Sequence, residues 1–187
     1  MQPLSLTQRI DQISQHIVRA RLYLDLWSYF EEEDSRHRII HTMREYNEFF
    51  RFTPHAYLAT FVIYASGAFD KRRDTISLRP LFREVSVAGH LQQQNISLIE
   101  TSLEQAQPIA DKVAILRHKA FAHRSAHISY NDVFQMASVT PNELRELTVI
   151  ALSISNCLLL AVGLHEQHFR ELPRNAAESM MDALARK

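Results

Sequence analysis

Apolar residues near the start of the chain recur in alternating steps of four and three. This spacing predicts one long helix, ending near Phe30, with a continuous apolar stripe that suits packing along another helix. A second stripe of the same kind predicts another helix after the acidic run at 31–34. The first stripe comprises Leu6, Ile10, Ile13, Ile17, Ala20, Leu24 and Trp27, and the second comprises Ile39, Met43, Tyr46 and Phe50.

Helix-start signals divide the middle of the chain. Thr53-Pro54 predicts an N-cap followed by proline at the first helical position, and the apolar segment after it predicts a central helix. The charged loop 70–74, interpreted chiefly as solvated surface, is expected to end that helix, and Ser77 is expected to cap a short one. Ser97 and the glutamate three residues later fit a capping box. Pro108 then either kinks the helix that follows or begins a further one.

A second strong start signal lies in the C-terminal part of the chain. Thr140–Glu143 combines a cap, a proline and a glutamate at the third position. From there a helix is expected to extend to His168, about 40 Å at ~1.5 Å per residue, and Pro173 is expected to end it. Residues 174–187 are interpreted as a loose C-terminal helix, and residues 126–138 as irregular or weakly helical.

These elements predict an all-α fold. The chain shows no strand pattern and no internal repeat, and its 3 glycines and 6 prolines among 187 residues are few for a turn-rich all-β fold. A hydrophobic content of 46% is typical of a globular protein with a core. We therefore expect a bundle of about five or six helices over residues 1–172, with one long C-terminal helix, followed by a helical tail over residues 173–187.

Composition limits the classes of function. Lys plus Arg and Asp plus Glu both number 21, so a nucleic-acid site, if present, must be local. The single Cys157 excludes an intrachain disulfide and a cysteine-based zinc cluster. The most apolar run, Val149 to Leu164, is shorter than the ~20 residues that a membrane span needs, and the N-terminus shows no secretion signal. A cytoplasmic protein without a membrane partner is expected.

The most unusual stretch is Lys112 to His127, whose second half is crowded with basic and imidazole side chains and contains no Asp or Glu. A cationic patch beside histidines that exchange protons is what cleavage of an RNA phosphodiester requires. An arginine can hold a phosphate by two parallel hydrogen bonds and stabilise transition-state charge. The crowded side chains are Arg117, His118, Lys119, His123, Arg124 and His127.

Helical spacing places two of these residues on different faces. The stripe Ile109, Val113, Leu116 and Ala120 continues to His123, which is expected to point toward the helix seam. On a straight α-helix, Arg117 and His123 lie about 9 Å apart along the axis and about 120° apart around it. Within one subunit, the two side chains can meet only through the long reach of arginine or through a break in the helix. This separation favours a dimer, in which two subunits supply the groups.

The segment from Arg117 to His123 resembles the motif of the HEPN superfamily, an arginine separated from a histidine by four to six residues. The wider frame is similar to the AbiU2-like branch of that superfamily, known from phage-defence and toxin systems. Ser125 departs from it, because an acidic residue is expected there. The residues that carry the resemblance are Leu116–Arg124, Tyr64–Asp70 and Ile76–Phe82.

The resemblance implies a metal-independent RNA endonuclease that acts as a toxin or phage-defence effector. It implies that Arg117 and His123 are catalytic, and that two copies face one cleft in a homodimer. His118, Lys119 and Arg124 are then candidate RNA-binding residues, and no cofactor or metal is expected. An antitoxin protein is a candidate partner beside the RNA.

Three alternatives remain open at this stage. The first alternative is a catalytically silent HEPN-like module that binds a nucleotide or a partner protein. The second is an unrelated helical interaction domain. In those cases His123 is a buried structural histidine and Arg117 a surface ion-pair partner. A zinc site at His123 and His127 has suitable spacing only on a continuous helix, and no third ligand is evident.

Overall fold

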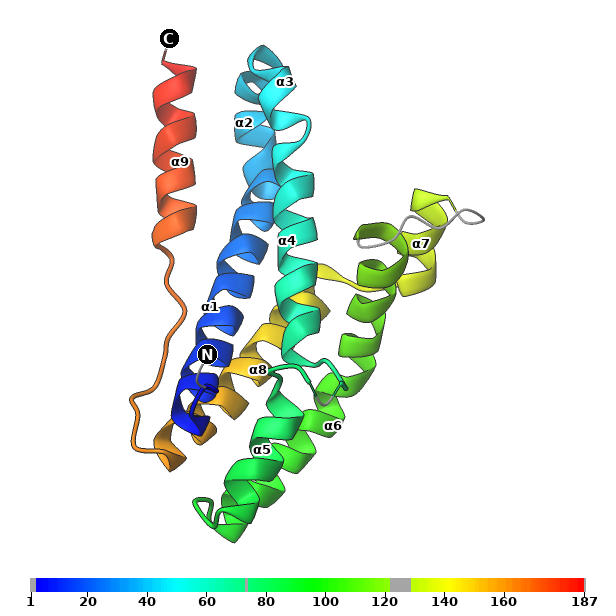
Figure 1. Cartoon of the computed structure of the whole chain (residues 1–187). Helices are drawn as coiled ribbons and strands as arrows, with labels where there is room; N and C mark the ends of the chain where they lie inside the picture. The colour runs from blue at the N-terminus through cyan, green and yellow to red at the C-terminus, as the bar shows by residue number, and fades with distance from the viewer. Residues whose placement is uncertain (1–2, 73, 122–128, 187) are drawn as a thin grey trace.

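The computed structural model describes residues 3–72, 74–121 and 129–186, and it folds them into a bundle of helices without a strand (Figure 1). The predicted all-α class is confirmed, although the chain forms more helices than the five or six expected. The helices are α1 (Leu6–Glu31), α2 (Glu33–Glu45), α3 (Asn47–Phe50), α4 (Thr53–Ala68), α5 (Leu78–Val87), α6 (Gln93–Leu116), the π-helix η1 (Arg117–Phe121), α7 (Tyr130–Ala137), α8 (Pro141–Ala161) and α9 (Leu172–Ala185).

Helix α1 lies at the centre of the bundle and packs mainly on α4 and α8. It begins with a capping box at Ser5, which accepts a hydrogen bond from the backbone of Gln8. Its predicted stripe is buried from Ile10 to Leu24, both fully covered, whereas Leu6 and Trp27 at its ends are partly buried. Helix α1 therefore contributes to both large core clusters, and in the first of them its side chains share the core with those of α4 and α6.

The start signals of the middle helices were only partly correct. Pro54 does lie in the first turn of α4, but the N-cap is Phe52, and the Thr53 hydroxyl instead donates to the Phe49 carbonyl at 2.7 Å. The capping box predicted at Ser97 is wrong, because α6 begins one turn earlier, at Gln93, without a side-chain cap. Pro108 lies inside a continuous α6 and starts no new helix.

Helix α8 is shorter than predicted. Its capping box at Thr140 is confirmed, but the helix ends at Ala161 after 21 residues, about 32 Å at ~1.5 Å per residue. The chain leaves the helix because Gly163 adopts φ = 76°, a left-handed conformation that glycine accepts at little cost. The Asn156 side chain then bonds both backbone groups of Gln167, which holds the following segment against α8.

Helix α8 is the one described helix long and apolar enough to cross a membrane by length and composition. In this bundle it is a core helix of a soluble domain, because its apolar face is covered by α1, α5 and α6. The buried residues of that face are Leu144, Leu147, Ala151, Ile154, Leu158 and Leu159.

The C-terminal part of the chain packs back onto the start of the bundle. Pro173 lies in the first turn of α9 and does not terminate α8. Helix α9 runs beside α1 and α2 and buries Ala177 and Met181 against Tyr29 and Phe30 (Figure 1). Within the stretch expected to be irregular or weakly helical, Tyr130–Ala137 forms α7, and its C-cap Ser138 has φ = 47°. The division of the chain at residue 172 remains a prediction.

Candidate functional site

Arg117 lies where α6 changes its helical geometry. Leu116, the last α-helical residue, is 1% exposed in the core, and Arg117 begins the π-helix η1. The backbone N–H of Arg117 bonds the carbonyls of both Val113 and Ala114, a shared hydrogen bond that is common at the end of an α-helix. Wider π turns are rare and frequently occur at functional sites. Arg117, whose side chain is 27% exposed, therefore lies at the junction of the α-helix and the π turn.

The π turn changes the geometry expected for the Arg-His motif. The spacing of Arg117 and His123 was derived for a straight α-helix, and that assumption does not hold beyond Leu116. His123 and Arg124, like His127 of the zinc alternative, lie outside the described residues. Their predicted roles therefore stay predictions.

Asp70 is the ion-pair partner of Arg117 in the described part of the chain. Its Oδ2 lies 3.5 Å from Nη1 of Arg117, which joins the end of α4 to the end of α6. Arg72 donates its backbone N–H to Asp70 at 2.9 Å and its guanidinium at 3.1 Å. The Ser77 hydroxyl, fully buried, donates to the Asp70 carbonyl at 2.8 Å. Asp70 is therefore fixed by both its backbone and its carboxylate.

The charge of Asp70 is stabilised by these neighbours. Burial by itself raises the pKa of Asp70, but the hydrogen bonds from Arg72, its charge and the bond from Arg117 outweigh burial. The pKa of Asp70 is consequently held below its ordinary value. An anionic Asp70 at neutral pH keeps Arg117 pointed toward the loop after α4.

Arg117 and Asp70 line a pocket of about 410 Å³ between α4 and α6. Asp111, also in the lining, accepts hydrogen bonds from Lys71 at 3.2 Å and Gln107 at 2.8 Å. Each of the two carboxylates thus accepts hydrogen bonds from cationic or amide donors that also line the pocket. The described lining consists of Ser66, Phe69, Asp70, Lys71, Arg72, Gln107, Ala110, Asp111, Ala114, Arg117 and His118.

The structure brings together only part of the predicted site. Arg117 and His118 share the pocket, whereas Lys119 does not line it and instead places Nζ 3.6 Å from the Met136 sulfur on α7. Sequence reasoning missed Asp70 and interpreted the loop 70–74 mainly as solvated surface. The sequence did contain a signal for Asp70, because Tyr64–Asp70, one of the segments that carry the HEPN resemblance, ends on this aspartate. Within residues 3–72, 74–121 and 129–186, no three His, Cys, Asp or Glu side chains gather as a metal site.

We expect Asp70→Asn to lower the free energy of unfolding by about 1–2 kcal/mol at pH 7, because charge-assisted hydrogen bonds contribute roughly that much. The folded-state pKa of Asp70 is depressed. This contribution to stability is therefore present at pH values above the ordinary pKa of an aspartate, and it is lost as the pH falls through the folded-state pKa. Urea unfolding from pH 7 toward pH 2 should show the two proteins converging. Asp74→Asn, an exposed change on the same loop, is the control, expected to stay within about 0.5 kcal/mol of wild type at every pH.

The comparison with family models gives the class of this helical bundle, which is a protein of the HEPN superfamily. The chain belongs to the AbiU2 family of the HEPN superfamily: the family model described as AbiU2 matches residues 4–179. The match spans the bundle and most of α9. No curated protein and no solved structure matches the chain.

Proposed function

We propose that this protein is a metal-independent RNA endonuclease, a cytoplasmic toxin or phage-defence effector of the AbiU2 family. The observation that carries the proposal is the pocket around Arg117, where Asp70 orients the guanidinium of the arginine that begins the HEPN-like Arg-His segment of the sequence. The loop cations Lys71 and Arg72 add positive potential for a phosphate. The carboxylates of this pocket are already paired with donors, so they form no free oxygen cluster of the kind that Mg²⁺ prefers.

The proposed reaction uses the RNA's own nucleophile. The 2′-hydroxyl attacks the neighbouring phosphorus while His123 accepts its proton, and the bond from phosphorus to the 5′-oxygen breaks. Arg117 stabilises the negative charge that accumulates on the phosphate oxygens. The departing 5′-oxygen takes a proton from a second acid, for which the His123 of another copy is the proposed source. The products are a 2′,3′-cyclic phosphate and a 5′-hydroxyl.

A homodimer follows from the need for both an acid and a base. Each chain carries one Arg117–His123 motif, so a two-fold interface that places two motifs in one groove completes the set. Light scattering at micromolar concentration is expected to give about twice the 21.7 kDa mass of the chain. A strict monomer that still cleaves RNA would refute the shared groove and leave cleavage to a single chain.

Cleavage of RNA against DNA of the same sequence separates the proposal from its rival, a silent module that binds a nucleotide or partner protein. We expect the RNA strand to be cut and the DNA strand to resist, because DNA lacks the 2′-hydroxyl. The rate should fall as salt rises, since phosphate contacts release counterions. Cleavage of the DNA strand would contradict the chemistry, and RNA binding without cleavage across several substrates would favour the silent module.

A further inference from the structure

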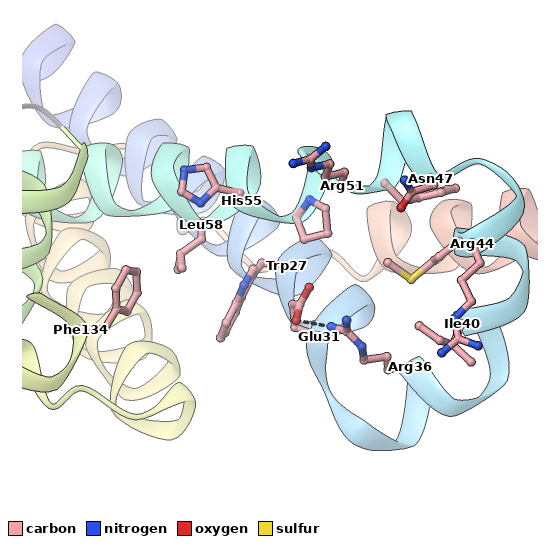
Figure 2. Close-up of a pocket in the computed structure, with 13 residues that line it drawn as sticks. Trp27, Glu31, Arg36, Ile40, Arg44, Asn47, Arg51, His55, Leu58 and Phe134 are labelled. Atoms are coloured by element: carbon pink, nitrogen blue, oxygen red, sulfur yellow. Dashed lines mark hydrogen bonds and ion pairs between the residues drawn. The ribbon is translucent and has the colours of Figure 1, made fainter. Parts of the chain in front are cut away.

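A second pocket, of about 390 Å³, lies near the other end of α4 and is not used by the proposed chemistry. It falls in the range of roughly 300–1,000 Å³ that is typical of ligand pockets. The end of α1, helices α2 and α3, the first turns of α4 and one residue of α7 enclose it (Figure 2). Its described lining consists of Trp27, Glu31, Arg36, Ile40, Met43, Arg44, Asn47, Phe50, Arg51, Pro54, His55, Leu58 and Phe134.

The charge of this pocket is unbalanced. Glu31 is the one acidic residue among its described lining, and Arg36 already forms an ion pair with it. Arg44 and Arg51 are exposed and form no ion pair with any residue in the described part of the chain. Two cations therefore remain to attract an anion, in a chain whose formal net charge is zero.

The opposite end of the pocket is aromatic. Figure 2 shows Trp27, His55 and Phe134 gathered at one end, whereas Arg36 and Arg44 lie toward the other. Flat aromatic faces beside cations are what single-stranded nucleic acids use, because bases stack on the rings and phosphates bind the cations. An acidic peptide matches the arginines, but its Asp and Glu side chains offer no aromatic ring to stack on Trp27.

Contacts of the same residues link this pocket to the candidate active site. The ring centroids of His55 and Phe121 are 5.5 Å apart, and Phe121 is the last residue of η1, the π-helix that Arg117 begins. On the outer side, Phe52 is 60% exposed and the guanidinium of Arg51 lies 5.4 Å from its ring centroid. An RNA strand leaving the motif therefore meets an aromatic surface first and cations next.

We propose that this pocket binds a nucleotide of single-stranded RNA that flanks the scissile phosphate, an assignment that rests on the proposed function. A base packs against Trp27 and His55, and the neighbouring backbone phosphates bind Arg44 and Arg51. The pocket thus fixes the register of the strand, while Arg117 acts on the phosphate that is cleaved.

The test uses the full-length protein and a 2′-O-methyl RNA oligonucleotide, which binds without being cleaved because its 2′-oxygen is blocked. Trp27 is the single tryptophan of the chain, so quenching of its fluorescence reports directly on this pocket. We expect saturable quenching in the wild type and a roughly tenfold weaker Kd for Arg44→Gln/Arg51→Gln. Loss of two phosphate contacts should also reduce the slope of log K against log salt by about 1.4.

The matched control is Arg170→Gln/Arg174→Gln, which removes the same charge from exposed arginines outside both pockets and should leave Kd unchanged. On a cleavable RNA, KM should rise in the first double variant by about the same factor as Kd. Equal affinities in the two double variants would overturn the inference even if wild type cleaves RNA, and so would a polysulfate such as heparin quenching Trp27 equally well. Binding that depends on Arg44 and Arg51, in a protein that cleaves no RNA, would retain the RNA pocket and refute the endonuclease.

Discussion

Replacing Arg117 by alanine is expected to lower the rate constant of RNA cleavage by about two to three orders of magnitude, because the loss of one oriented donor to transition-state charge typically has that effect. The fold should persist. The Arg117 side chain is 27% exposed and Asp70 keeps its hydrogen bonds to Arg72, so the variant should unfold at nearly the same urea concentration. Single-turnover cleavage at saturating protein measures the effect directly.

Two further substitutions make the Arg117 experiment specific. Arg117→Lys keeps the charge but loses the paired, planar donors, so it should recover only a small part of the rate. Arg170→Ala removes an exposed arginine far along the chain and should cleave like wild type. If Arg117→Ala is folded and cleaves at the wild-type rate, the pocket is not the active site and the arginine is only the partner of Asp70.

His123→Ala should abolish RNA cleavage and growth toxicity, because it removes the group proposed to accept the proton of the 2′-hydroxyl. Proton transfer by a positioned side chain contributes about two to four orders of magnitude in rate. Circular dichroism and urea unfolding should match wild type. His165→Ala, which removes an exposed imidazole outside both pockets, is the matched comparison and should retain most of the activity.

The two histidine variants also test the alternative that His123 is a buried structural histidine. A variant that is unfolded would identify His123 as a structural histidine near a helix end. A folded His123→Ala protein that remains fully toxic would remove this residue from the mechanism. Mixing His123→Ala with Arg117→Ala chains is informative as well, since partial recovery of cleavage on subunit exchange requires a groove shared between two copies.

The fold was largely predictable because its signals are local. The apolar stripe through Ile10 and Leu24 predicts both the helix and its buried face, and the capping box at Thr140 predicts where α8 begins. The end of α8 was predicted wrongly because apolar residues continue past Ala161. Gly163, which adopts a positive φ just after the helix, was the sequence signal of a helix end that was overlooked. The start of α6 at Gln93 carries no side-chain cap, so no sequence signal marked it.

The candidate site was less predictable because it depends on contacts between distant segments. Arg117 was identified from its motif, but its pairing with Asp70 spans α5 and most of α6 and leaves no local pattern. The π turn at η1 likewise has no characteristic amino-acid composition. The direction of Arg117 around the helix axis was therefore calculated for an α-helix, which is the wrong geometry here. The pocket around Arg44 and Arg51 combines residues from five helices, among which sequence spacing suggests no relation.

The measurement that tests the central claim most directly is the chemistry of the product ends. RNA is incubated with the purified protein in excess EDTA, and the fragments are analysed by mass spectrometry. Attack by the 2′-hydroxyl, with Arg117 and His123 as the active groups, predicts upstream fragments that end in a 2′,3′-cyclic phosphate and downstream fragments that begin with a 5′-hydroxyl. Fragments with 3′-hydroxyl and 5′-phosphate ends, formed only when Mg²⁺ is restored, would contradict the account.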